Sequence, residues 1–236
     1  MPLPIDVYLG ALRREGDGLA AAAENRLDAA VVACPGWDVA DLVWHAGEVF
    51  SFWATVAEGA EGPDVHEPDR PPRPEVVGWY RSQLERLERV LTDADPLTPC
   101  WTCAGSQTVA WIQRRMAQET AVHRCDAQAE PDPIDPVLAV DGIDEFLELF
   151  LETTPNIEGT VHLHATDAEG EWLIRTAPGR PIEVERGHAK GDVAVRATAS
   201  DLLLLLWRRR ALADGGFEVF GDASLAETFV AASSLE

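Results

Sequence analysis

The chain has few basic residues for its length. Its 236 residues include 19 lysines and arginines against 41 aspartates and glutamates, which gives a net charge of −22 at neutral pH. A nucleic-acid-binding face needs clustered Lys and Arg, and an anionic membrane surface attracts the same residues. We therefore expect neither a nucleic-acid nor a membrane partner. The acidity indicates no other partner, because net charge mainly affects solubility.

Long apolar runs are also missing. No apolar run is longer than Leu202–Trp207, far short of the ~20 residues that a membrane-spanning helix needs. The N-terminal sequence MPLPIDVYLGALRREG has neither the basic segment nor the apolar core of a signal peptide. We expect a cytoplasmic protein.

Cysteine is scarce, and its spacing favours no disulfide framework. The four cysteines are Cys34, Cys100, Cys103 and Cys125, and only Cys100 and Cys103 form a Cys-x-x-Cys pair. A single pair without a second one, and without a strand–helix–strand context, is a weak redox or zinc signal. Reduced thiols are the expectation for such a chain, and any role of Cys100, Cys103 or Cys125 stays open.

The first ~150 residues show the 3.6-residue periodicity of helices, interrupted by loops rich in proline and glycine. The expected helices are about Pro4–Val31, a second one that follows Asp38, about Glu75–Leu91, about Thr108–Gln128 and about Pro136–Glu152. Asp38 is a good N-cap, and Asp41 three residues later makes a variant of the capping box. We expect Trp101–Gln107 to be a loop. The first four helices predict an antiparallel four-helix bundle, a scaffold that often builds metal sites from facing helices.

The periodicity changes to that of strands after Thr154-Pro155. Val161, Leu163 and Ala165 alternate with His162 and His164, which predicts a strand with the two histidines exposed and no third ligand nearby. Further strands are expected in GEWLIRTA, PIEVERG, DVAVRAT and residues 217–220, with helices capped by Ser200 and Asp222. The predicted fold class is α+β with two domains, a helical bundle over residues 1–154 and a small α+β domain over 155–236.

Four residues of the fourth helix form one stripe. Ile112, Met116, Glu119 and His123 lie at relative positions 0, +4, +7 and +11, so the spacing puts a carboxylate and an imidazole on an apolar face. A buried charge costs several kcal/mol unless it is paired or binds a metal. The four-residue spacing lets Glu119 and His123 reach one ion. The alternative is a core histidine that bonds to the neighbouring glutamate.

The second helix supplies another histidine, His45, at the edge of its apolar face. His45, Glu119 and His123 together make a set of two histidines and one glutamate, which suits zinc or another divalent ion and leaves one coordination position for water or substrate. Asp126 is expected either to orient a ligand from outside the metal's own shell or to be a solvated charge at the helix end. Glu48 is likewise expected either to orient a ligand or to be a solvated charge.

Trp207-Arg208-Arg209-Arg210 follows the leucine run. These cations are expected to favour the C-terminal end of their helix through its dipole. The functional alternative is that Arg208 binds a substrate carboxylate with two hydrogen bonds.

Two segments carry a family resemblance. CPGWDVADLVWHAGEVFSFW and WTCAGSQTVAWIQRRMAQETAVHRCDA resemble the mycothiol-dependent maleylpyruvate isomerase family, and VFGDASLAETFV fits the family's ending. The resemblance implies a DinB-like metal-binding bundle followed by a domain like the sterol carrier proteins. It also implies that His45, Glu119 and His123 correspond to the family's metal ligands. Cys103 and Cys125 stand where the family often has aromatic residues.

The resemblance implies an enzyme that uses a divalent metal, with zinc expected, and mycothiol as cosubstrate. The metal's open position would bind the mycothiol sulfur as a thiolate, which attacks an electrophilic small molecule. Reversible addition to a cis double bond would give an isomerase, and other electrophiles would give S-transfer. A metal-dependent hydrolase with Glu48 as base, or a non-catalytic metal- or ligand-binding protein, remain the alternatives. The substrate and the oligomeric state stay open.

Overall fold

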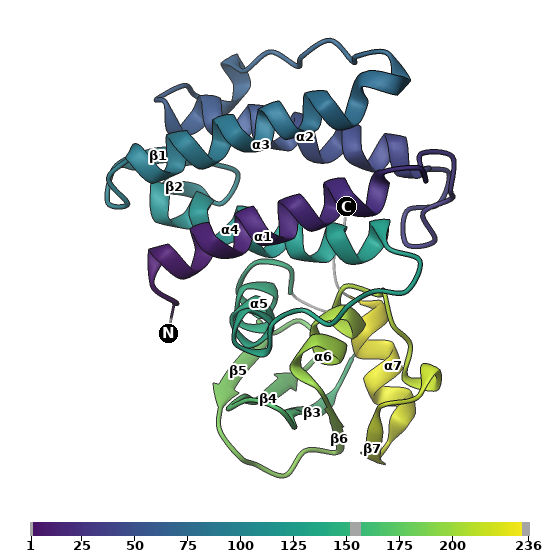
Figure 1. The fold of residues 1–236 in the computed structure, drawn as a ribbon. Coiled ribbons are helices and arrows are strands. Elements are labelled where there is room, and N and C mark those ends of the chain that lie inside the picture. The colour runs from purple at the N-terminus through teal and green to yellow at the C-terminus, as the bar shows by residue number, and fades with distance from the viewer. Residues whose placement is uncertain (1, 152–156, 233–236) are drawn as a thin grey trace. The chain divides into compact units, whose positions relative to one another are not determined.

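The computed structural model describes residues 2–151 and 157–232, and its contacts divide the chain into two units, Met1–Asp132 and Pro133–Glu236 (Figure 1). The expected fold class, a helical domain followed by a small α+β domain, is confirmed. The boundary expected at residues 154 and 155 lies outside the described residues. By its contacts, the helix that the sequence grouped with the bundle belongs to the second unit instead.

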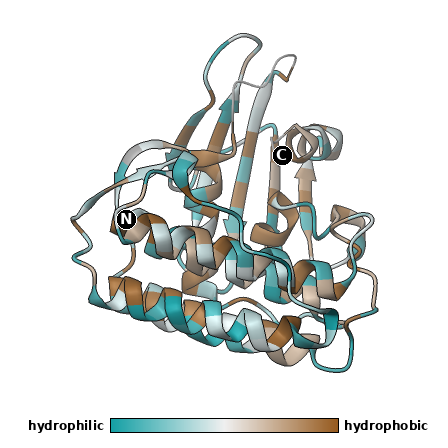
Figure 2. Cartoon of the chain, turned by 90° about the horizontal axis from the view of Figure 1, so that it is seen from above, coloured by the Kyte–Doolittle hydropathy of each residue, from teal (hydrophilic) through white to brown (hydrophobic). Residues whose placement is uncertain are grey.

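The first unit is a bundle of four long helices: α1 (Ile5–Ala23), α2 (Val39–Ala57), α3 (Val76–Asp93) and α4 (Val109–Ala127). Short 3₁₀ turns, η1 (Gly62–Asp64) and η2 (Arg73–Glu75), lie in the proline-rich segment between α2 and α3. Hydrophobic and hydrophilic residues alternate along the helices, as the brown and teal bands of Figure 2 show. The apolar faces meet in a core whose residues include Leu12, Leu42, Phe50, Leu87 and Ile112, each at most 2% exposed.

The start of α2 follows the sequence prediction closely. The Asp38 carboxylate accepts a hydrogen bond from the Asp41 N–H, and the Asp41 carboxylate accepts one from the Asp38 N–H, which completes the capping box. This cap sets where α2 begins. His45, in the second turn of α2, lies beside Glu119 and His123 of α4.

Two local predictions were wrong. Helix α1 ends at Ala23 rather than near Val31, because Glu24 is extended and Asn25 has a positive φ of 64°, a conformation that stops a helix. The segment expected to be a loop contains a hairpin of β1 (Pro99–Thr102) and β2 (Gly105–Thr108), and Gly105, the first residue of β2 after the turn, has a φ of 90°. Four-residue strands carry too little periodicity to be separated from a loop by pattern.

The second unit is a five-stranded sheet with helices. Its elements are α5 (Pro136–Leu149), β3 (Gly159–Ala165), β4 (Glu171–Thr176), β5 (Glu183–Arg186), β6 (Val193–Ala197), α6 (Ala199–Leu206), η3 (Leu212–Asp214), β7 (Glu218–Gly221) and α7 (Ala223–Ala231). The strand order is β5-β4-β3-β6-β7, with β3 and β6 parallel and the other neighbours antiparallel. The connection from β5 to β6 therefore passes two strands.

The caps of the last helices are partly as expected. Asp222 accepts a hydrogen bond from the Ser224 N–H at the start of α7, which confirms its predicted role. At the start of α6 the cap is Thr198, which accepts from the Asp201 N–H, and not Ser200. The Ser200 hydroxyl is buried and accepts a hydrogen bond from the Ile134 N–H instead. No helix within the described ranges is long and apolar enough to cross a membrane.

Candidate metal centre

Helices α2 and α4 bring together the three side chains that the sequence singled out. His45 comes from α2, and Glu119 and His123 come from α4. One nitrogen or oxygen atom of each side chain lies within 4.8 Å of those of the other two. His45 Nε2 lies 4.0 Å from Glu119 Oε1, and the His45 and His123 rings are 5.5 Å apart, edge to face. The three groups thus point toward one common position.

This position is partly open to solvent. The His45, Glu119 and His123 side chains are 33%, 18% and 13% exposed, whereas Ile112 and Met116 on the same stripe of α4 are fully buried. The stripe therefore runs from the core to the surface, and Glu119 is not enclosed as the sequence argument assumed. Partial exposure leaves a small molecule a route to the three groups.

Glu119 has a second partner that the sequence argument overlooked. Arg115, one helical turn before it, places Nη2 3.2 Å from Glu119 Oε2. This ion pair already compensates part of the carboxylate's charge, so burial alone does not require a metal. The pair also orients the group, because Oε2 is turned to Arg115 and Oε1 to His45. The four-residue spacing of Arg115 and Glu119 was a usable signal for this contact.

Asp126 contacts His123 directly, as the first of its two interpretations requires. His123 Nδ1 lies 3.0 Å from Asp126 Oδ2, and the Asp126 side chain is only 1% exposed. An ionised carboxylate can only accept, so the ring donates from Nδ1, and the neutral form of this tautomer has its lone pair on Nε2. A carboxylate held behind a histidine in this way fixes both the tautomer and the ring orientation of a metal ligand.

His45 is held by the loop that precedes α2. The Trp37 ring lies 5.1 Å from the His45 ring, and the Trp37 carbonyl accepts a hydrogen bond from the Val31 N–H, which closes the loop. Gly36 has φ 90°, a conformation that suits glycine. Burial, followed by the neighbouring His123, lowers the pKa of His45, although Glu119 opposes this. Trp37 is a contact that the sequence argument did not assign.

The donor set fits a divalent transition metal. Two imidazole nitrogens and one carboxylate oxygen are ligands that zinc accepts, and three protein ligands are typical of sites that keep one position open. The two histidines and the glutamate already converge, and His123 has the partner that metal-binding histidines usually have. Few rearrangements of side chains are needed for such an ion.

Two further candidates lie elsewhere. The Glu48 carboxylate does not belong to the converging group of described residues, and burial and then the nearby charge of Glu67 raise its pKa. Arg208 belongs to the second unit, where its guanidinium donates to the carbonyls of Val230 and Ala231 at the end of α7. That contact gives Arg208 a structural role in fastening α7.

The Cys-x-x-Cys pair forms part of the β1–β2 hairpin. Cys100 lies in β1 and lines a hollow of about 390 Å³ together with Trp101 and residues at and after the end of α2, and Cys103 is exposed in the turn. Both thiols are free, and burial raises the pKa of the Cys100 thiol. A redox pair needs an accessible thiolate, so these features disfavour a redox role.

Comparison with known proteins gives a consistent result over both units. The family described as "Mycothiol maleylpyruvate isomerase N-terminal domain" matches residues 9–128, and the "MDMPI C-terminal domain" matches residues 137–228. No curated protein sequence matches the chain.

Two solved structures are similar over most of their length. The crystal structure of the mycothiol-dependent maleylpyruvate isomerase is 13% identical, with a TM-score of 0.62 over 92% of this chain and 93% of that chain. A histidine-to-alanine mutant of such an isomerase is 12% identical, with a TM-score of 0.59 over 86% and 88% of the two chains. At these identities the likeness shows a shared fold.

Proposed function

The chain belongs to the mycothiol maleylpyruvate isomerase family, and from this premise we propose that it is a metal-dependent enzyme with mycothiol as cosubstrate. His45, Glu119 and His123 would hold the metal, for which zinc is the leading candidate. The substrate would be an electrophilic small molecule of the maleylpyruvate kind. The observation that carries the proposal is the convergence of these three side chains from two helices.

The bound metal would supply the positive charge that keeps a thiol deprotonated at neutral pH. Mycothiol would supply a sulfur nucleophile that adds to an electrophilic carbon and, for an isomerisation, leaves again once the former double bond has rotated. The chain's own residues prepare the site for this chemistry. They hold the three ligands in place and admit the reactants.

Asp126 and Arg115 would act as positioning residues. Asp126 accepts a hydrogen bond from the Nδ1–H of His123, which leaves Nε2 of that ring as the atom that would bind a metal. Arg115 binds one oxygen of Glu119 and leaves the other on the side of His45. Trp37 restricts the His45 ring from the side of the loop. Each ligand thus has one neighbour that limits its motion.

A comparison of the wild-type chain with His123→Ala tests the metal site. We expect the variant to hold one metal ion fewer per chain by elemental analysis. His66→Ala is the matched control, because His66 is an exposed histidine outside the three-residue group, and it should keep the wild-type metal content. Equal metal content in the wild type and His123→Ala would refute the site.

The thiol dependence needs its own measurement. Mycothiol added to the cobalt-substituted wild type should produce a sulfur-to-metal charge-transfer band, and turnover of maleylpyruvate should require the thiol. His123→Ala should lose both signals. Turnover of an electrophile without any thiol, with no such band at saturating mycothiol, would contradict the proposal and favour the hydrolase.

A further inference from the structure

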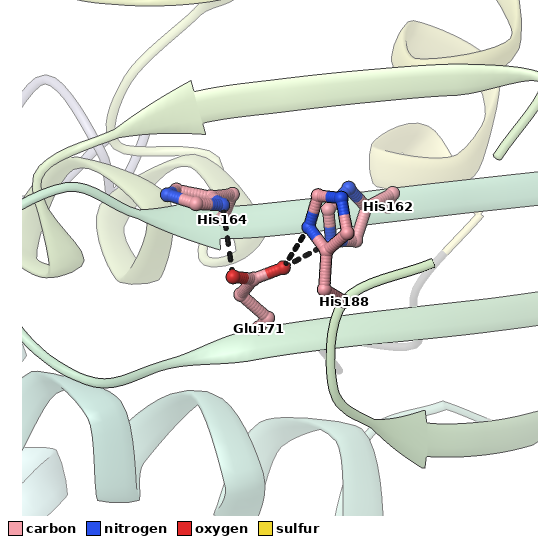
Figure 3. A group of neighbouring side chains, drawn as sticks. All are labelled: His162, His164, Glu171 and His188. Atoms are coloured by element: carbon pink, nitrogen blue, oxygen red, sulfur yellow. Dashed lines mark hydrogen bonds and ion pairs between the residues drawn. The ribbon is translucent and has the colours of Figure 1, made fainter. Parts of the chain in front are cut away.

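Three histidines and one glutamate meet on the sheet of the second unit, and none of them belongs to the candidate metal centre. His162 and His164 lie on β3, Glu171 begins β4, and His188 lies in the connection from β5 to β6. Figure 3 shows the three imidazoles turned toward the Glu171 carboxylate. The sequence argument expected His162 and His164 to be exposed and without a third ligand, and this was wrong. His162 is only 4% exposed, and the other two residues complete the group.

Strand register places three of the four residues on one face of the sheet. The antiparallel pairing of β3 and β4 sets His164 directly opposite Glu171, so their side chains point to the same side. His162 is two residues before His164 on β3 and therefore points to that side as well. Val161 and Leu163 point to the other side and are buried.

The crossover connection supplies the fourth residue. Because β4 and β3 separate β5 from β6, the chain that leaves β5 at Arg186 has to pass both strands. His188 lies two residues into this connection, with its Nδ1 atom 2.8 Å from Glu171 Oε2. Its side chain is 81% exposed.

All four groups converge on a small volume. His162 Nε2 lies 3.0 Å from Glu171 Oε2, and His164 Nδ1 lies 3.3 Å from Glu171 Oε1. One donor atom from each of the four residues lies within 4.8 Å of all the others. Two imidazoles contact the same oxygen of the Glu171 carboxylate, and the third contacts the other oxygen.

The chemistry of the group suits a metal. Three imidazole nitrogens and one carboxylate oxygen are a complete four-ligand set for zinc and related ions. A histidine binds a metal through a ring nitrogen that carries no proton, so an ion that enters the group would replace the hydrogen bonds to Glu171.

We propose that His162, His164, Glu171 and His188 form a second binding site, specific for a divalent transition metal of the zinc class. Four protein ligands leave no open position, so the site is structural rather than catalytic. Its effect is to fasten the β5–β6 connection to β3 and β4. The proposal is independent of the proposed function, because it uses no residue of the first site.

The test uses the full-length chain carrying His123→Ala, so that zinc binding at the first site does not contribute to the measured signal. Zinc is titrated while the labelling rate of each histidine by diethyl pyrocarbonate is followed by mass spectrometry. We expect zinc to slow the labelling of His188 by at least about tenfold, because a coordinated nitrogen cannot react. The exposed His66 is an internal reference and should be labelled at an unchanged rate.

Glu171→Gln separates metal binding from hydrogen bonding. The amide keeps the size of the side chain and an acceptor oxygen for the imidazoles, but it lacks the charge of a good ligand. We expect protection of His188 to need at least about tenfold more zinc in this variant. Glu169→Gln removes the same charge from an exposed position two residues earlier and should behave like its parent.

A second variant covers the case in which Glu171→Gln does not fold. His188→Ala changes the most exposed member of the group and should bind one zinc ion fewer per chain than its parent. Labelling of His188 at the same rate with and without zinc would overturn the proposal. Equal zinc requirements of Glu171→Gln and Glu169→Gln would also overturn it. Both of these results are expected if hydrogen bonds alone hold the cluster.

Discussion

The ion pair between Glu15 and Arg124 is the contact whose loss should destabilise the bundle most clearly. It joins α1 to α4, with Arg124 Nε 2.7 Å from Glu15 Oε2, and the two side chains are only 6% and 5% exposed. Arg124 follows His123 directly, so the pair also anchors the helix that carries Glu119 and His123. Removing one partner leaves the other charge buried.

The expected size of the effect follows from this burial. Breaking a buried pair from one side costs about 3–5 kcal/mol, because the remaining charge loses its opposite charge at a position that water reaches poorly. Glu15→Gln should therefore lower the free energy of unfolding of the first unit by about that amount. The melting temperature should fall on the order of 10 °C. Arg124 keeps its bonds to Gln128 and to the Asp132 carbonyl, but both acceptors are neutral.

A pair with an exposed arginine on the same helix is the matched control. Arg13 Nε lies 3.1 Å from Glu88 Oε2, and the Arg13 and Glu88 side chains are 72% and 16% exposed. Pairs of this kind contribute roughly 0.2–1 kcal/mol, so Arg13→Gln should change the stability little. Both variants break an arginine–glutamate pair that involves α1, and the two pairs differ most in the exposure of the arginine.

Urea unfolding followed by tryptophan fluorescence provides the measurement. The first unit holds the reporters Trp37, Trp44, Trp53, Trp79, Trp101 and Trp111. Glu15→Gln should shift the midpoint without changing the slope. The double variant Glu15→Leu/Arg124→Met should recover most of the loss, since an apolar pair leaves no buried charge. Equal effects of Glu15→Gln and Arg13→Gln, or a double variant as unstable as the sum of its single variants, would refute the reasoning.

Two further predictions concern Asp126 and Asp38. Asp126→Asn should lower the metal affinity of the first site by roughly 10–100-fold while the fold persists, because the amide lacks the charge that strengthens His123 as a ligand. Competition with a chelator measures the affinity. An unchanged affinity would count against the positioning role of Asp126. The pKa of Asp38 lies below its ordinary value of 3.8, because hydrogen bonds from Arg73 and from the Asp41 N–H outweigh the effect of burial. The stability that Asp38 contributes is therefore present above pH 4 and is lost as the pH falls through its lowered pKa. Asp38→Asn should lose less stability than the wild type as the pH falls below 4, when the free energy of unfolding is measured against pH. An equal loss in the variant and the wild type would contradict this.

Local spacing explains what could be predicted from the sequence. The capping box at Asp38 and Asp41 involves residues three apart, and the stripe with Glu119 and His123 follows from the helical period. Such relations are set by backbone geometry over one or two turns, and the surrounding fold changes them little. The contacts of Asp126 with His123 and of Arg115 with Glu119 belong to the same class, although only the first was considered.

Contacts between distant segments could not be derived in this way. The Glu15–Arg124 pair joins residues 109 positions apart and exists only because α1 packs on α4. The end of α1 depends on the left-handed conformation of Asn25, which a neighbouring sequence does not impose. The assignment of α5 to the second unit likewise follows from its packing partner α6, and its periodicity alone is compatible with either unit.

The histidine group on the sheet shows the division most clearly. The alternation of β3 determined that His162 and His164 share a face, because side chains of a strand alternate with a period of two. Their exposure and their partners depended on which strand pairs with β3, in which register, and on the path of the connection after β5. A strand's own residues do not specify these, since pairing is a property of two segments and the order of strands is a property of the whole sheet. The sequence therefore determined the face, and only the tertiary structure brought Glu171 and His188 to it.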